Sequence, residues 1–541
     1  KKGVERLAAD GVRIVRSDED RDERDLAMLF EKQAKDWHLP DLPRAVDPVT
    51  GTGVFGVESR GYRQDGKSYV TLVNHQDRVR KVRLEASGVD LITGRRLPEV
   101  IDLDPLVPLF IEMPTCRQPM EDILVNKPDY VVYVPTLPIA VQHRKLPYVE
   151  ARRRGDSYND HFQVLDDAQR GFLYAFWTQA SWEGCSDQHI AFSKSLDKGR
   201  SWTKPIVLAG SECRAFPKLR ASWQQPMLSE SGRLYCLWNQ QTTSRKPHFG
   251  QMFGAFSDDA GETWSEPKQV PFPCRMDQDD PDPTVPPCWC NWQRPLRIGE
   301  GGRYFVGCSR HGKAPYDEKA CCKIEFWQFE NIDDDPKVED ILFSQFATNR
   351  DSLSSDKVEP IPGVRYFVPT LNPEGKPEDP ALEEASLVRL PDGRLFAMMR
   401  SSLGWPVWSQ SRDSGRTWSG LKALLDAEGK PIPHPRSPCP LYDWKGLEAG
   451  SGKYFALVHM KFDFTAKTAY QTRGPLYLIA GEYDPTGDQP IRFAAPKLFA
   501  PRPKDNSFYT SYTVLDGEGV LWFNDKKYYL LGRKIGPEWF D

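Results

Sequence analysis

The sequence predicts an all-β protein whose larger part is a six-bladed β-propeller, preceded by a small accessory domain. Three observations favour this fold. Aromatic residues make up 12% of the 541 residues, and 46 Pro and 40 Gly supply many turns. A unit of two short strands joined by a Gly-containing turn recurs six times. A second motif, S-x-D-x-G-x-x-W, occurs three times within these units.

Residues 1–115 differ in pattern from the rest of the chain and predict the accessory domain. The stretch 53–97 alternates apolar and polar residues, which is typical of half-buried strands, and residues 27–39 have a helical pattern. The region resembles the C-terminal part of β-galactosidase-like glycosidases, in which an α/β remnant precedes a small β-sandwich. We expect an accessory domain of a helix remnant and a β-sandwich, truncated at its N-terminus and without a catalytic motif.

Residues 116–541 are predicted to form the propeller. The six copies of the repeat start roughly 50 to 90 residues apart, so each has room for the four strands of a blade. Stretch 121–136 precedes the first copy and is expected to supply the strand that closes the ring against the sixth blade. The copies begin at His161, Gln224, Gln293, Glu384, Arg436 and Tyr509.

The S-x-D-x-G-x-x-W motif spans residues 195–202, 257–264 and 411–418. Its Asp can accept hydrogen bonds from turn N–H groups, its Gly can adopt a positive φ, and its Trp can pack between sheets. We therefore interpret each copy as a structural hairpin between the third and fourth strands of a blade. Three such Asp boxes (BNR repeats) on a sixfold repeat resemble the sialidase (neuraminidase) superfamily, over about residues 120–541.

The repeat also predicts where polar side chains meet. Adjacent strands of a blade are antiparallel, so the start of the first strand and the end of the second lie at one rim. In a propeller the innermost strands line the central channel, and these residues converge on one mouth. Arg side chains at such a mouth suit an anionic sugar, because they bind carboxylates through paired hydrogen bonds. The residues that close second strands are Thr178, Asn239, Arg310, Arg400 and His459.

The resemblance to sialidases implies roles for five residues. Tyr509 matches the family's nucleophile, and Glu384 matches the Glu that takes its proton. Arg400 and Arg473 match the residues that clamp the substrate carboxylate, and Asp187, in the loop before the first Asp box, matches the acid/base. A neutral Tyr suits a sialoside, since the carboxylate on the anomeric carbon repels a charged nucleophile.

One position departs from the family pattern. His161 stands where the resemblance places a third Arg of the carboxylate clamp, and the arginines at 152–154 lie just upstream. We expect His161, Arg310, Gln293 and Gln224 to act as further substrate-binding residues at the mouth.

These features predict a glycoside hydrolase of the sialidase superfamily that removes a terminal acidic sugar from a glycan, in the manner of an exo-α-sialidase, without a cofactor. Two alternatives remain open. In the first, a divergent propeller hydrolase or lyase uses His161 to cleave a uronic-acid-containing glycan. In the second, the propeller binds glycans without catalysis.

Composition and charge argue against several other classes. The net charge of −4 and the lack of a long basic run argue against a nucleic-acid partner, and no stretch of 18 apolar residues is present. The pairs Cys288/Cys290 and Cys321/Cys322 lack zinc-knuckle spacing, so among the 11 Cys, buried thiols or disulfides are favoured over a metal site. The chain begins with Lys, so we expect a missing leading segment and a secreted or periplasmic location. The oligomeric state stays open.

Overall fold

The structure is a computed structural model. It describes residues 57–64, 67–84, 87–114, 125–134, 158–210, 219–242, 249–271, 279–280, 282, 284–311, 322–362, 364, 381–465, 471, 473–502 and 508–541. The helix expected at 27–39 and the arginines at 152–154 lie outside these residues. By its internal packing the chain divides into two compact units, residues 1–122 with 136–154 and residues 123–135 with 155–541.

The smaller unit is an antiparallel β-structure. A five-stranded sheet has the order β1-β2-β7-β4-β5, and β3 pairs with β6. Burial alternates along β2, which matches the period-2 pattern of its sequence, and the alternating residues build an apolar core around Leu72, Leu103 and Ile111. The strands are β1 (Val57–Gln64), β2 (Lys67–Asn74), β3 (Arg80–Arg83), β4 (Gly88–Asp90), β5 (Arg96–Leu97), β6 (Val100–Leu103) and β7 (Leu109–Pro114).

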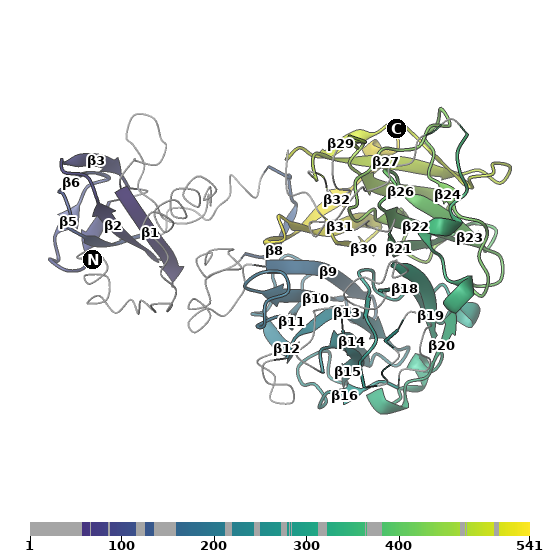
Figure 1. Cartoon of the computed structure of the whole chain (residues 1–541). Helices are drawn as coiled ribbons and strands as arrows, with labels where there is room; N and C mark the ends of the chain where they lie inside the picture. The colour runs from purple at the N-terminus through teal and green to yellow at the C-terminus, as the bar shows by residue number, and fades with distance from the viewer. Residues whose placement is uncertain are drawn as a thin grey trace. The chain divides into compact units, whose positions relative to one another are not determined.

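In the part of the larger unit that the structure describes, there are six sheets of antiparallel strands. Five of them are formed by strands that follow one another along the chain. Figure 1 shows these sheets following one another around the unit in chain order. The first three sheets are formed by β9 (Tyr158–Asp167), β10 (Phe172–Ala180), β11 (His189–Ser195) and β12 (Ile206–Gly210); by β13 (Ala221–Leu228), β14 (Leu234–Gln240), β15 (Gln251–Ser257) and β16 (Lys268–Gln269); and by β17 (Trp289–Cys290), β18 (Tyr304–Arg310), β19 (Lys323–Phe329) and β20 (Phe343–Phe346).

The last sheet takes a strand from the start of the unit. β8 (Tyr130–Tyr133) pairs with β32, with Val131 opposite Leu531, so the stretch 121–136 supplies the fourth strand of this sheet, as its position in the sequence predicts. The other three sheets are formed by β21 (Leu382–Arg389), β22 (Leu395–Ser401), β23 (Val407–Ser411) and β24 (Lys422–Ala423); by β25 (Leu441–Asp443), β26 (Lys453–Val458), β27 (Leu476–Tyr483), β28 (Ile491–Phe493) and β29 (Lys497–Ala500); and by β30 (Thr510–Leu515), β31 (Glu518–Asp525), β32 (Tyr529–Ile535) and β8.

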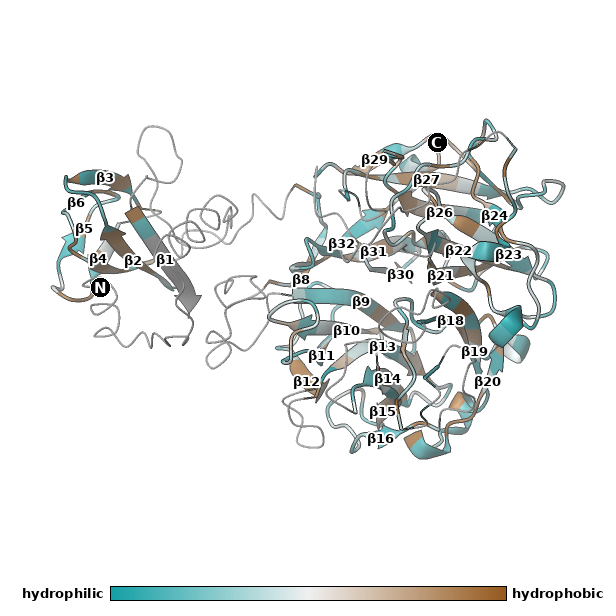
Figure 2. Ribbon diagram, in the orientation of Figure 1, coloured by the Kyte–Doolittle hydropathy of each residue, from teal (hydrophilic) through white to brown (hydrophobic). Residues whose placement is uncertain are grey.

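Successive sheets pack against one another through their faces. Buried apolar clusters join the first sheet to the second, the second to the third, the fourth to the fifth, and the sixth to the first. The third and fourth sheets meet where Phe326 stacks on Trp418 at 4.1 Å between ring centroids. The fifth and sixth meet where the Tyr442 hydroxyl donates to the carbonyl oxygen of Thr510 at 2.7 Å. Figure 2 shows hydrophobic segments within many of these strands.

The three S-x-D-x-G-x-x-W motifs form the same turn. In each, the Asp accepts a hydrogen bond of 2.8 Å from the backbone N–H four residues later, and the Gly has a φ between 80° and 89°. Each Trp contacts an aromatic ring of the preceding sheet: Trp202 contacts Trp522, Trp264 contacts Phe192, and Trp418 contacts Phe326. The turns therefore hold neighbouring sheets together, which agrees with a structural role for their Asp residues.

The described residues contain β-strands and short 3₁₀ turns as their regular structure. Among them, no helix has the length and apolar character needed to cross a membrane.

Candidate active site

Three residues near the starts of first strands share an unusual backbone conformation. His161, Trp223 and Glu384 have φ values of 54°, 57° and 56°, and the strand pairing shifts by a residue beside each of them. A non-Gly residue at positive φ costs about 1–3 kcal/mol. The extra residue of a β-bulge re-aims a side chain, and bulges are common beside active sites. A β-bulge with a residue at positive φ therefore re-aims one side chain in each of three sheets.

A buried tyrosine, glutamate and arginine are hydrogen-bonded to one another. The Tyr509 hydroxyl donates to Oε1 of Glu384 at 2.8 Å. Nη1 of Arg400 donates to the Tyr509 oxygen at 3.1 Å and to Oε2 of Glu384 at 2.6 Å. Burial raises the pKa of the Tyr509 phenol well above its usual value, and Glu384 adds to the rise while Arg400 opposes it. The phenol is therefore neutral, with its proton directed at a carboxylate that can accept it.

Further arginines extend this group on one side. Nε of Arg400 lies 3.1 Å from Oε1 of Glu383, and Arg436 contacts both oxygens of that carboxylate at 2.7 and 3.1 Å. Nη2 of Arg473 donates to the carbonyl oxygen of Arg436 at 2.8 Å. Burial pushes the pKa of Glu383 upward, but Arg400 and Arg436 together bring it well below its usual value. Three guanidinium groups therefore line this side of the site.

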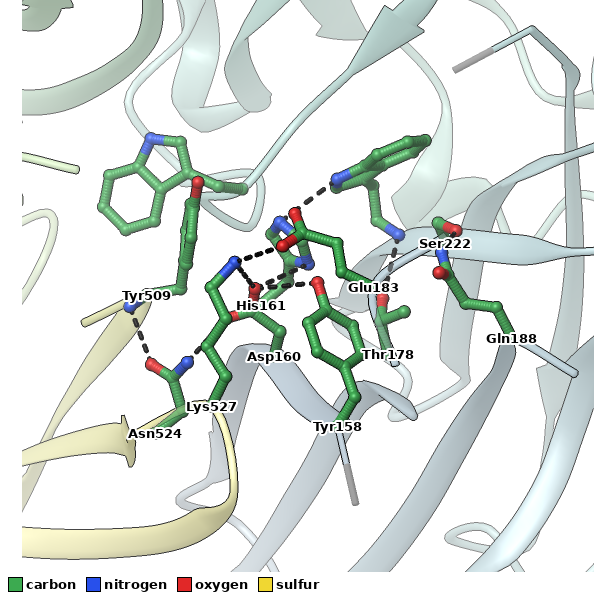
Figure 3. A network of polar contacts seen from close by, with 12 residues as sticks. Tyr158, Asp160, His161, Thr178, Glu183, Gln188, Ser222, Tyr509, Asn524 and Lys527 are labelled. Carbon is green, nitrogen blue, oxygen red and sulfur yellow. Dashed lines mark hydrogen bonds and ion pairs between the residues drawn. The ribbon is translucent and has the colours of Figure 1, made fainter. Parts of the chain in front are cut away.

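A second charged group, around Asp160 and Lys527, also lies close to Tyr509 (Figure 3). Asp160 is fully buried and accepts hydrogen bonds from the Tyr158 hydroxyl at 2.9 Å and from Nδ2 of Asn524 at 2.5 Å. Nζ of Lys527 lies 2.8 Å from Asp160 and 5.3 Å from the centroid of the Tyr509 ring. Oδ1 of Asn524 also accepts the backbone N–H of Tyr509 at 2.8 Å. The network therefore fixes the backbone and ring of Tyr509 together.

Glu183 joins this network from the turn that follows β10. Its Oε2 lies 3.1 Å from Nζ of Lys527, although its side chain is 67% exposed. Lys527 lowers the pKa of Glu183 to about 2, and His161 and Arg473 contribute to the shift. Figure 3 shows Glu183 directed toward the residues around His161. An ionised carboxylate at the rim therefore faces the cations of the site.

His161 is buried, and burial lowers the pKa of its imidazole. Its ring centroid lies 4.5 Å from that of Tyr509. Nε1 of Trp223 donates to Nε2 of His161 at 3.1 Å, so the proton of the neutral ring lies on Nδ1, which is 4.0 Å from Asp160. His161 therefore offers a neutral donor at the position where the resemblance predicted a guanidinium.

Asp187 lies on the same turn as Glu183 and is held by its neighbour Ser181. Its carboxylate accepts the backbone N–H of Ser181 at 3.2 Å and the Ser181 hydroxyl at 2.5 Å. Its own carbonyl oxygen is 2.8 Å from Nδ1 of His189. Among the described residues, the carboxylate of Asp187 contacts Ser181 of the same turn. The carboxylate of Glu183, in that turn too, contacts Lys527.

Gln224 and Gln293 lie between sheets, not with the charged groups around Tyr509. The amide of Gln224 donates to the carbonyl oxygen of His161, and its oxygen accepts the Thr178 hydroxyl at 3.0 Å. Gln293 accepts the backbone N–H of Leu387 at 3.0 Å. The preceding tryptophans approach the site instead, since Trp223 reaches His161 and the ring centroid of Trp292 lies 6.2 Å from that of Tyr509.

Arg310 is also engaged elsewhere. It is fully buried, contacts both oxygens of Asp279 at 2.6 and 2.8 Å, and lies 3.4 Å from Glu325. Arg310 is therefore paired with Asp279 and Glu325 and not with the groups around Tyr509. The structure therefore brings together Tyr509, Glu384 and Arg400, with Arg473 and His161 beside them.

Comparisons with known proteins give structural likenesses only. No protein-family model and no curated protein matches the chain. A variant of the NanB sialidase from Streptococcus pneumoniae has 11% identity and a TM-score of 0.48, over 86% of this chain and 82% of that chain. The Hadza microbial sialidase Hz136 has 13% identity and a TM-score of 0.47, over 92% and 99%. The intramolecular trans-sialidase from Ruminococcus gnavus has 13% identity and a TM-score of 0.45, over 71% and 96%. TM-scores below 0.5 assign neither a fold nor an activity to this chain.

Proposed function

We propose that the larger unit is a six-bladed β-propeller of the sialidase type and that it hydrolyses the bond to a terminal acidic sugar of a glycan. Six sheets in chain order, the contacts between each sheet and the next, and the strand exchange through β8 support the propeller. The three identical turns, proposed to be Asp boxes, support the likeness to sialidases.

The contact between Tyr509 and Glu384 carries the proposal for the chemistry. In the first step the Tyr509 oxygen bonds to the anomeric carbon, its proton passes to Glu384, and the glycosidic C–O bond breaks. The leaving oxygen takes a proton from an acid. In the second step water bonds to the anomeric carbon and gives a proton to the conjugate base of that acid, while the bond to Tyr509 breaks and its oxygen recovers the proton from Glu384. Glu384 is 2.8 Å from the hydroxyl, which is within the reach of a general base.

The acid/base residue is proposed to come from the turn after β10. Asp187 is the first candidate, because the resemblance to sialidases places the acid/base there, and Lys527 lowers the pKa of Glu183 to about 2, which disfavours Glu183 as a proton donor. Arg400 and Arg473, with Arg436, would bind the substrate carboxylate. His161 would donate from Nδ1 to a sugar oxygen rather than pair with the carboxylate.

The experiment that tests this function measures release from fluorogenic α-sialosides, uronides and neutral glycosides. We expect wild-type turnover on an acidic sugar, and Tyr509→Phe to lower kcat by on the order of 10³-fold or more, as when other enzymes lose a nucleophile. Tyr512→Phe is the matched control, since the Tyr512 hydroxyl in β30 donates only to the carbonyl oxygen of Trp444 in the contacts described. Equal turnover by wild type and Tyr509→Phe would contradict the proposal.

One observation favours a second candidate function. A buried neutral imidazole lies beside Tyr509, in the place of a clamp arginine. His161 could then use Nε2, once it is released from Trp223, to remove the proton α to the carboxylate of a uronide, while the C–O bond at the β carbon breaks and the leaving oxygen takes a proton from water. The product would carry a C=C bond that absorbs ultraviolet light. Asp187→Asn and Glu183→Gln separate the candidates further, because only the hydrolase needs an acid from their turn. Glycan binding without any turnover would instead identify a binding module.

A further inference from the structure

Three side chains of metal-ligand type meet beside Arg400 and Arg436, where the third and fourth sheets adjoin, and a fourth, that of Cys290, contacts one of them. One ligand atom each of His311, Cys322 and Glu383 lies within 4.8 Å of the others. Sγ of Cys290 lies 3.3 Å from Nε2 of His311. Three of the four are buried and His311 is half-buried, so the cluster has a route to solvent through the histidine.

The backbone holds these residues in place. Cys290 is the last residue of β17 and pairs with Ser309 in β18. His311 is the residue directly after β18, and Cys322 is the residue directly before β19. The carbonyl oxygen of Cys322 accepts a hydrogen bond of 3.3 Å from the N–H of Leu382, beside Glu383. The ligands are therefore carried by strand ends, which position side chains more closely than a long loop does.

The ligand types and separations suit a thiophilic cation. In a tetrahedral zinc site with bonds of about 2.0–2.3 Å, neighbouring ligand atoms lie roughly 3.3–3.8 Å apart. The separation of 3.3 Å between Cys290 and His311 falls in this range. The ligand atoms of His311, Cys322 and Glu383 lie within 4.8 Å of one another, about 1 Å beyond this range, and Cys290 would join them by rotation of its side chain from its contact with His311. Two sulfur ligands with one imidazole select Zn²⁺ over Mg²⁺ or Ca²⁺.

The charges nearby are compatible with such a cation. Two thiolates neutralise a divalent ion, so Glu383 can keep its ion pairs with Arg400 and Arg436. Oε2 of Glu383 accepts a hydrogen bond of 3.1 Å from Arg436, and a carboxylate oxygen has room for a second partner.

We propose that Cys290, His311, Cys322 and Glu383 bind one Zn²⁺-like divalent cation. The site is independent of the proposed hydrolysis. It touches the active site through Glu383, whose Oε1 lies 3.1 Å from Nε of Arg400. The bound cation would act as a structural link between the third and fourth sheets, orienting the carboxylate that holds two arginines.

The test uses Co²⁺ in place of Zn²⁺, because Co²⁺–thiolate bonds absorb in the near ultraviolet. We expect wild-type protein, reduced and stripped of metal, to bind about one Co²⁺ or Zn²⁺ per chain with this absorption. Cys322→Ser and Cys290→Ser should each lower the affinity at least about tenfold and weaken the absorption. His311→Asn should lower the affinity while leaving the thiolate absorption in place.

Controls separate this site from other thiols and from misfolding. Cys236→Ser removes a thiol buried in the second sheet and should leave Co²⁺ binding unchanged. His311 is half-buried, so His311→Asn reports on binding even where a buried Cys variant fails to fold. Wild-type protein without Co²⁺–thiolate absorption would overturn the proposal. So would a signal that is lost in Cys321→Ser or Cys236→Ser but kept in Cys322→Ser.

Discussion

Tyr509 lies close to two charged groups that the chain supplies in different ways. On one side, Glu384 and Arg400 come from neighbouring strands of a single sheet, β21 and β22. On the other, Asp160 comes from β9 and Lys527 from the turn after β31, so the first and sixth sheets must meet before the pair can form. The first group is formed within one copy of the repeat, whereas the second is formed only where the first and last sheets adjoin. We therefore expect the first group to govern chemistry and the second to govern stability.

The largest effect is expected on the Lys527 side. Lys527→Met leaves the fully buried Asp160 without its cation, and breaking a buried pair in this way costs about 3–5 kcal/mol of unfolding free energy. Denaturant unfolding measures the loss. Lys527→Met combined with Asp160→Asn should recover part of it, because the unpaired charge is then removed. A stable single variant would show that the pair does not hold the join.

The next effect is expected on the Arg400 side. Arg400→Lys keeps the positive charge but loses the fork that contacts Tyr509, Glu383 and Glu384 together. We expect kcat/KM on the acidic glycoside to fall by about 10²-fold, with a smaller loss of stability than in Lys527→Met. Steady-state kinetics on folded protein checks this. A loss of stability without a loss of kcat/KM would reverse the assignment of the two sides.

A smaller effect is expected in the pH dependence of the unfolding free energy, and His161, beside Asp160, contributes to it. Burial lowers the pKa of His161, and it lowers the pKa of His459 to about 4. A folded-state pKa below the unfolded value means that the unfolded chain binds more protons, so stability falls as pH drops below about 6.5. Unfolding measured between neutral and mildly acidic pH should show this slope, and His161→Asn should reduce it. An unchanged slope in the variant would mean that folding does not shift the pKa of His161.

The smallest effect is expected for Glu183→Gln. The Glu183 side chain is 67% exposed, so its pair with Lys527 should contribute less than about 1 kcal/mol to the unfolding free energy. Its pKa of about 2 means that this contribution is present above the ordinary carboxylate pKa and is lost as pH falls toward 2. Parallel unfolding of wild type and variant measures the difference. A loss comparable to that of Lys527→Met would place Glu183 inside the buried network.

Strand order in the repeat was enough to predict one side of the site. The sequence placed Glu384 at the start of a first strand and Arg400 at the end of a second, and they are 2.6 Å apart. It also predicted the strand that β8 supplies to the last sheet. These predictions depend only on the order of antiparallel strands, which the spacing of apolar runs and turns reveals.

The same reasoning missed the other side because bulges and turns decide it. In the second sheet the repeat pointed to Gln224 as the first residue at the mouth, but the bulge brings Trp223 to that place and leaves Gln224 between sheets. A shift of one residue changes the face on which a side chain lies. The repeat could not point to Lys527 and Asp160, because neither recurs at the equivalent position of the other copies. The two residues meet only where the first and sixth sheets adjoin.

In the proposed hydrolysis, the Tyr509 oxygen bonds to the sugar. The direct measurement is mass spectrometry of the protein after reaction with a fluorinated acidic glycoside, in which the fluorine slows hydrolysis of a covalent intermediate. We expect an added sugar mass on the peptide that contains Tyr509, absent in Tyr509→Phe and present in Tyr512→Phe. A sugar mass on another residue, or turnover of the parent glycoside without any adduct on Tyr509, would contradict it.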